Sequence, residues 1–164
     1  MLYCRCFYPD ASMWNLRYNS PYIVTIFVSS IQTTMTRVII VDNEPTFRKG
    51  LKAILTNIGN VEVVGEASNG EEFLKLIDGT SADIVFMDVK MPILDGVEAT
   101  RKARMSHPEM HIIGFSSYEN EDYVNRMVEA GACGYLTKSG DNYDLLSQII
   151  NNPEAGIFPG AKKF

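Results

Sequence analysis

The chain has 164 residues, of which 46% are hydrophobic and 21% charged, and it carries a formal net charge of −5 at pH 7. This composition is typical of a soluble globular protein, and the length fits one ordinary domain with residues to spare. The acidic balance and the lack of clustered Lys and Arg argue against a nucleic-acid-binding surface, because phosphate contacts need grouped cations.

Residues 1–34 are rich in Tyr, Ser and Asn with few acidic residues, which predicts an N-terminal extension that is disordered or adds a strand. Its apolar run, Tyr22–Val28, is far shorter than the roughly 18 residues of a transmembrane helix and lies late for a signal peptide. Met35 directly precedes a strand pattern, so we expect the folded unit, and the natural start of translation, to begin there. The three cysteines form neither a disulfide framework nor a zinc pattern, which favours a reducing cytoplasm.

From Thr36 onward, short apolar runs alternate with segments of helical period, which is the pattern of βαβ units in a parallel sheet. The predicted strands cover residues 37–41, 61–67, 83–87, 112–115 and 134–137. The predicted helices run from Pro45 to before Gly59, from Asn69-Gly70 through Ile77, and over residues 97–105, 120–129 and 142–151. We therefore expect an α/β domain over residues 35–152, with a doubly wound sheet covered by helices on both faces, and a short tail at 153–164.

Polar side chains follow four of the predicted strands: Asp42, Asp88, Ser116 and Lys138. Because the carboxyl ends of parallel strands share one edge of a sheet, and ligands bind at that edge, we expect these side chains to lie close together. Paired carboxylates there are hard oxygen ligands of the kind that suit Mg²⁺.

This set also matches what phosphoryl transfer to an aspartate requires. Asp88 would be the nucleophile, Mg²⁺ and Lys138 would neutralise the phosphoryl oxygens, and Ser116 would donate a hydrogen bond. Each residue alone is more often a turn residue, a loop hydroxyl or a solvated charge. Their joint placement at successive strand ends favours the functional interpretation.

The sequence strongly resembles the receiver domain of bacterial two-component response regulators over residues 35–152. The matching segments are VIIVDNEP (Val38–Pro45), DIVFMDVKMPILDG (Asp83–Gly96), IIGFSS (Ile112–Ser117) and AGACGYLTK (Ala130–Lys138). The resemblance implies a flavodoxin-like (βα)5 fold and a sensor histidine kinase as phosphodonor. It also implies that Asp88 is the phosphoacceptor, and that Asp88, Asp42, Asn43 and the backbone carbonyl of Lys90 hold Mg²⁺.

By the same resemblance, Lys138 binds the phosphate, Ser116 is the switch hydroxyl, and Tyr135 is the switch aromatic that turns inward on activation. Lys90 and Tyr118 occupy positions that tune dephosphorylation in the family. Phosphorylation is then expected to reshape the surface made by the last two helices and the fifth strand, where family members form homodimers or meet their outputs.

Two positions depart from the family pattern. Asn43 replaces the second of two adjacent Asp, so we expect weaker metal binding or slower phosphorylation, because an amide oxygen ligates without adding charge. Ser139 stands where many receivers have Pro, and GYLTK with FSSYEN looks most like the NarL/LuxR-like branch. That branch normally adds a DNA-binding helix-turn-helix domain, whereas only PEAGIFPGAKKF follows Asn152. We therefore expect no nucleic-acid or membrane contact by this chain itself.

The leading hypothesis is a phosphorylation-dependent signalling switch that catalyses only its own phosphorylation and dephosphorylation. It acts either as a single-domain receiver or as the receiver of a DNA-binding transcriptional regulator. A degenerate, phosphorylation-independent interaction module is the alternative, motivated by Asn43. A phosphatase of the haloacid-dehalogenase type is disfavoured, since Lys90 stands where those enzymes have a second Asp. Flavodoxin-like electron transfer is disfavoured because no phosphate-binding loop follows the first strand.

Overall fold

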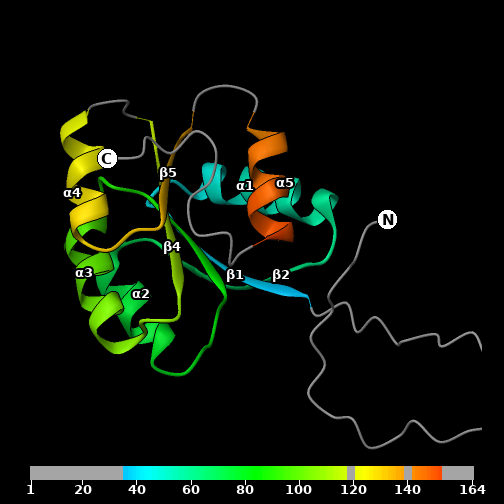
Figure 1. Cartoon of the computed structure of the whole chain (residues 1–164). Helices are drawn as coiled ribbons and strands as arrows, with labels where there is room; N and C mark the ends of the chain where they lie inside the picture. The colour runs from blue at the N-terminus through cyan, green and yellow to red at the C-terminus, as the bar shows by residue number, and fades with distance from the viewer. Residues whose placement is uncertain (1–34, 118–120, 139–141, 153–164) are drawn as a thin grey trace, which may run out of the picture. The chain divides into compact units, whose positions relative to one another are not determined.

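The computed structural model describes residues 35–117, 121–138 and 142–152. These residues form a parallel sheet with the strand order β2-β1-β3-β4-β5 (Figure 1). The elements in chain order are β1 Thr36–Val41, α1 Pro45–Ile58, β2 Val61–Ala67, α2 Gly70–Ile77, β3 Ile84–Met87, α3 Gly96–Ser106, β4 His111–Ser116, α4 Glu121–Glu129, β5 Gly134–Thr137 and α5 Tyr143–Asn151. The predicted α/β class, the strands and the helices are confirmed, with boundaries shifted by one or two residues at most where both ends are described. The predicted extension 1–34 and tail 153–164 lie outside the described residues, so those limits stay predictions.

The central strands β1, β3 and β4 are largely apolar on both faces, as expected where helices cover both sides of a sheet, whereas the edge strand β2 carries Glu62 and Glu66. Successive residues of β1 point to opposite faces: Ile39 packs with α2, α3 and α4, whereas Ile40 packs with α1 and α5. Figure 1 shows the same division, with α1 and α5 on one side of the sheet and the other three helices on the opposite side. The core is therefore two apolar layers separated by the sheet.

Local sequence signals explain where several helices begin and end. Pro45 occupies the first turn of α1, and Gly59 follows its end with a φ of +83°, a conformation that favours glycine. The side chains of Asn69 and Asp95 cap α2 and α3 by accepting hydrogen bonds from backbone N–H groups in the first turn. Ile54 is 40% exposed although its spacing predicts a buried position, because it lies at the rim of a groove between α1 and α5.

The loop from β3 to α3 contains a strained residue. Ile93 has a φ of 69°, in the left-handed region that β-branched residues rarely adopt, and its side chain is 74% exposed. Such a conformation costs about 1–2 kcal/mol, which the surrounding loop must offset. The strain lies five residues after Asp88, on the loop that borders the candidate site.

Candidate functional site

The candidate site lies where β1 and β3, two neighbouring strands, end at the carboxyl edge of the sheet. The strand order reverses direction at this pair, which is where ligands bind in open parallel sheets. The ladder continues for one residue past each strand: Asp42 N–H donates to the Ala67 carbonyl (3.0 Å), and Asp88 N–H donates to the Val41 carbonyl (2.8 Å). Both aspartates are therefore held at the edge by the sheet itself.

Lys138 brings the two carboxylates together. Its Nζ lies 2.5 Å from Asp42 Oδ2 and 3.3 Å from Asp88 Oδ1, and the three side chains are only 8%, 2% and 7% exposed. Lys138 reaches this place because its own N–H donates to the Ser116 carbonyl (2.8 Å), which extends the pairing of β4 with β5. We call Asp42, Asp88 and Lys138 the edge cluster.

Two carboxylates and one ammonium give the edge cluster a formal charge of −1 in a buried place. Burial is the main cause that raises the pKa of Asp88, while the Lys138 charge lowers that pKa and the Asp42 charge raises it. Asp88 Oδ1 also accepts a hydrogen bond from Val89 N–H (2.9 Å). The two carboxylates of the edge cluster could therefore accommodate one more positive charge.

The predicted Mg²⁺ ligands form a donor set with only two carboxylates. The described residues contain no group of three or more His, Cys, Asp or Glu side chains arranged to hold a metal ion. Asn43, next to Asp42, carries an amide in place of a further carboxylate. The buried and incompletely neutralised oxygens of Asp42 and Asp88 still have the chemistry of a Mg²⁺ site that keeps several waters.

Asn43 and Lys90 line a small cavity of about 400 Å³ beside the edge cluster. Lys90 Nζ lies 4.8 Å from the centre of the Tyr123 ring, so its side chain extends toward α4. Arg126 of α4 lies 5.9 Å from the same ring centre and 3.8 Å from the Asp95 carboxylate. The residue two positions after Asp88 is thus connected to α4 by one cation–π contact, which the sequence did not indicate.

The two predicted switch residues are both buried. Ser116 is fully buried, and its Oγ has no hydrogen-bond partner among the described residues. Burial is the main cause that raises the pKa of Tyr135. The nearby Ser116 hydroxyl lowers that pKa in part, although Ser116 Oγ has no well-formed hydrogen bond within the described part of the chain. Tyr135 is 6% exposed, with its ring against Gly114, so it already lies inward, in the position that the family resemblance implies for the activated state. Tyr118 lies outside the described residues.

Two residues outside the predicted site, Gly96 and Phe47, also contact the edge cluster. A Cβ at Gly96 would lie 2.0 Å from the Asp88 carbonyl oxygen, so only glycine allows the start of α3 to approach the Asp88 backbone. Phe47 of α1 places its ring 4.4 Å from Lys138 Nζ. Gly96 belongs to the PILDG segment that matches the receiver pattern, so the sequence could have indicated it. Phe47 has only the spacing of an ordinary core position of an amphipathic helix.

Comparisons with known proteins identify relatives of this chain by sequence and by fold. The family described as the response regulator receiver domain matches residues 38–150. Response regulator GacA of Pseudomonas viridiflava is 39% identical over 115 residues, which are 70% of this chain and 54% of GacA. A LuxR-family response regulator from Aurantimonas sp. SI85-9A1 has a TM-score of 0.70 and 34% identity, covering 76% of this chain and 88% of that one. The NarL receiver domain of Mycobacterium tuberculosis has a TM-score of 0.68 and 28% identity, covering 73% and 97%. The chain spans about half the length of the curated relatives it matches.

Proposed function

The chain belongs to the response regulator receiver family, in its NarL/LuxR-like branch, and we propose that it is a switch operated by phosphorylation of Asp88. The phosphodonor is a sensor histidine kinase, and this chain receives the phosphoryl group in the cytoplasm. The observation that carries this proposal is the edge cluster, in which two buried carboxylates share a single lysine. Since the curated relatives are about twice as long, we also propose that this receiver controls a DNA-binding output in a transcriptional regulator.

Asp88 supplies the nucleophile. The contacts from Lys138 and Val89 both reach Oδ1, which leaves Oδ2 to form the bond to phosphorus. The bond between phosphorus and the donor's imidazole nitrogen breaks, and its electron pair stays on the imidazole. This attack needs the ionised carboxylate of Asp88. Lys138 favours that form, whereas burial raises the pKa of Asp88 and disfavours it.

The chain's own residues then stabilise the transferred group. Asp42, Asp88, the Asn43 side-chain oxygen and the Lys90 carbonyl are the groups that would hold Mg²⁺, which when bound neutralises charge on the phosphoryl oxygens. Lys138 exchanges its contact with Asp88 for a phosphoryl oxygen, and it keeps its contact with Asp42. Positioning and charge neutralisation supply most of the catalysis in this reaction.

Ser116 and Tyr135 transmit the effect of phosphorylation to other parts of the domain. A buried hydroxyl without a partner gains most from an incoming acceptor, so Ser116 Oγ donates to a phosphoryl oxygen. Its movement acts on the neighbouring Tyr135 and shifts the population of conformations at the α4–β5–α5 surface. That surface is then the place for a homodimer or an output domain.

The test is Mg²⁺-dependent labelling of the purified chain with radioactive acetyl phosphate. We expect Asp88→Asn to abolish labelling. Asp83→Asn is the matched control, because Asp83 lies at the opposite end of β3, where its Oδ2 accepts a hydrogen bond from Arg37 N–H (2.7 Å). Undiminished labelling of Asp88→Asn would remove Asp88 from its proposed role.

Asn43 favours a second candidate, a degenerate module that binds its partners without phosphorylation. Titration with Mg²⁺ separates the two candidates. No binding at millimolar Mg²⁺, together with no labelling of the wild-type chain, would support the degenerate module. Recovery of both properties in Asn43→Asp would then identify the missing carboxylate as the reason.

A further inference from the structure

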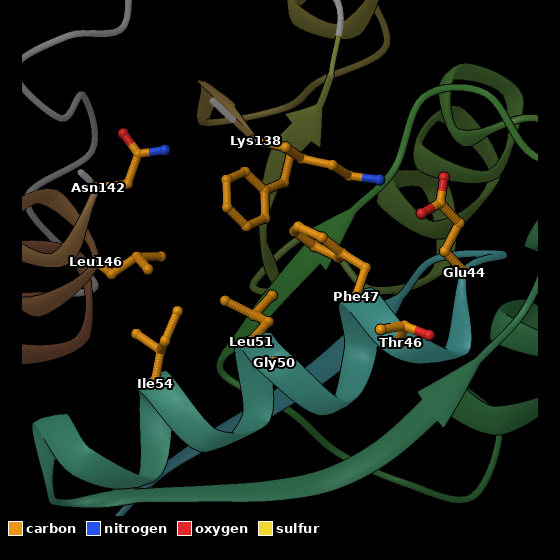
Figure 2. A pocket seen from close by; sticks show the side chains of 10 residues that line it. Glu44, Thr46, Phe47, Gly50, Leu51, Ile54, Lys138, Asn142 and Leu146 are labelled. Atoms are coloured by element: carbon orange, nitrogen blue, oxygen red, sulfur yellow. The ribbon is translucent and has the colours of Figure 1, made fainter. Parts of the chain in front are cut away.

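The ring of Phe47 lies against the cation of the edge cluster. Figure 2 shows the Lys138 side chain extending across the Phe47 ring at the start of α1, and Lys138 Nζ is 4.4 Å from the ring centre. The Lys138 side chain is only 8% exposed. A cation over an aromatic face is attracted by the ring's quadrupole, and the attraction is strongest where water is excluded.

Other rings fix the position of this ring. Phe47 packs edge-on against Phe115 of β4, with ring centres 5.4 Å apart and an angle of 64° between the planes. Phe115 in turn packs against Phe86 of β3, with ring centres 5.8 Å apart. Because β3 leads to Asp88 and β4 ends at Ser116, the Phe47 ring is tied to the strands that carry the site.

Core packing alone does not account for an aromatic residue here. Phe47 is half-buried, and it also lines a groove of about 610 Å³ between α1 and α5, shown in Figure 2. An aliphatic side chain could cover the same edge of the core, but it would offer no π face to an ammonium group. The cation–π contact with Lys138 is therefore a specific reason for the ring.

We propose that Phe47 is a positioning residue that holds the Lys138 ammonium between Asp42 and Asp88. An ammonium group on a four-carbon chain has many conformations and three equivalent donors. The ring restricts these conformations without accepting a hydrogen bond, so all three donors stay available to oxygen. The consequence for phosphorylation rests on the proposed function, whereas the ordering of Lys138 does not.

The test replaces Phe47 with mono-, di- and trifluorophenylalanine, which weaken the ring's quadrupole stepwise with little change in shape. We expect the order parameter of the Lys138 ammonium, from ¹⁵N relaxation without phosphodonor, to fall along the series. The rate of labelling by acetyl phosphate should fall in parallel, by on the order of tenfold in total. Phe47→Tyr keeps the π face and should retain both properties, whereas Phe47→Leu should lose both.

The same fluorinated series at Phe115 is the matched control, since that ring contacts Phe47 and is not the ring that lies under Lys138 in the structure. Urea unfolding of every variant identifies any loss of fold. Unchanged Lys138 order along the Phe47 series, or an equal fall along the Phe115 series, would overturn the proposal. If Lys138 order falls but the wild-type chain is never labelled, the positioning role stands and the proposed phosphotransfer fails.

Discussion

The edge cluster can be compared with a second charged cluster, formed by Arg48 and Lys52 of α1 and Glu66 of β2. In this α1–β2 cluster, Arg48 Nε and Lys52 Nζ lie 3.2 Å and 3.1 Å from the two carboxylate oxygens of Glu66. The Glu66 and Lys52 side chains are 33% and 50% exposed, whereas every side chain of the edge cluster is less than 10% exposed. The two clusters therefore use the same charge types, in opposite ratio and at different depths.

The pKa values move in opposite directions in the two clusters. Hydrogen bonding to Lys52 is the main cause that lowers the pKa of Glu66, whereas burial is the main cause that raises the pKa of Asp88. The Glu66 carboxylate is partly exposed and has two cations beside it, so its charge is fully compensated and its role is mainly structural. Two buried carboxylates with one cation are not fully charge-compensated, which is consistent with the proposed uptake of a metal ion and a phosphoryl group.

Removal of the lysine from each cluster should separate the two clusters most strongly. We expect Lys138→Met to lower the free energy of unfolding by about 3 kcal/mol at pH 7, because two buried carboxylates lose their counter-charge. Lys52→Met should cost at most about 0.5 kcal/mol, because exposed ion pairs are weak. Urea unfolding in metal-free buffer measures both changes. Equal losses in the two variants would mean that burial does not distinguish the clusters.

The sequence predicts the parts of the edge cluster that depend on chain order. Alternation of strands and helices predicts the parallel sheet, and the sheet then places Asp42, Asp88, Ser116 and Lys138 at one edge. The structure brings the two carboxylates and the lysine into contact as expected. These features follow from local periodicity and from one rule of topology, so no knowledge of side-chain packing is needed.

The remaining features depend on contacts between distant segments. Phe47 and Lys138 lie far apart in the sequence, and helical spacing alone does not indicate which buried group a ring will face. The close approach of Gly96 to Asp88 and the extension of Lys90 toward Tyr123 also depend on how the loops fold back. Side-chain rotamers decide whether Tyr135 lies inward, and the sequence carries no signal for them.

Asp88→Asn should stabilise the domain, because it removes a carboxyl group that burial disfavours in its ionised form. The folded pKa of Asp88 lies above its ordinary value of 3.8, so the native state binds this proton more tightly than the unfolded state. Stability from that proton is present below pH 3.8 and is lost as pH rises through the folded pKa. We expect the variant to gain on the order of 1 kcal/mol at pH 7.

Urea unfolding of Asp88→Asn and the wild-type chain in metal-free buffer, at pH 7 and at successively lower pH, provides the measurement. The gain should shrink as the wild-type carboxyl becomes protonated in both states. A variant that is less stable than wild type at pH 7 would contradict the sign of the pKa shift. The edge cluster would then resemble the α1–β2 cluster in its energetics.

Glu66→Gln should show the opposite sign and the smallest effect. Its pKa is lowered below 4.5 in the folded state, so its ionised form contributes stability that is present above pH 4.5 and lost as pH falls through the folded pKa. Because the cluster is partly exposed and screened by solvent, we expect a loss of at most about 0.5 kcal/mol at pH 7. Added salt should reduce this loss further, since screening acts on exposed charges, whereas the gain in Asp88→Asn should hardly change. Urea unfolding at low and high NaCl measures both responses, and the opposite ranking of salt sensitivity would show that depth of burial does not separate the two clusters.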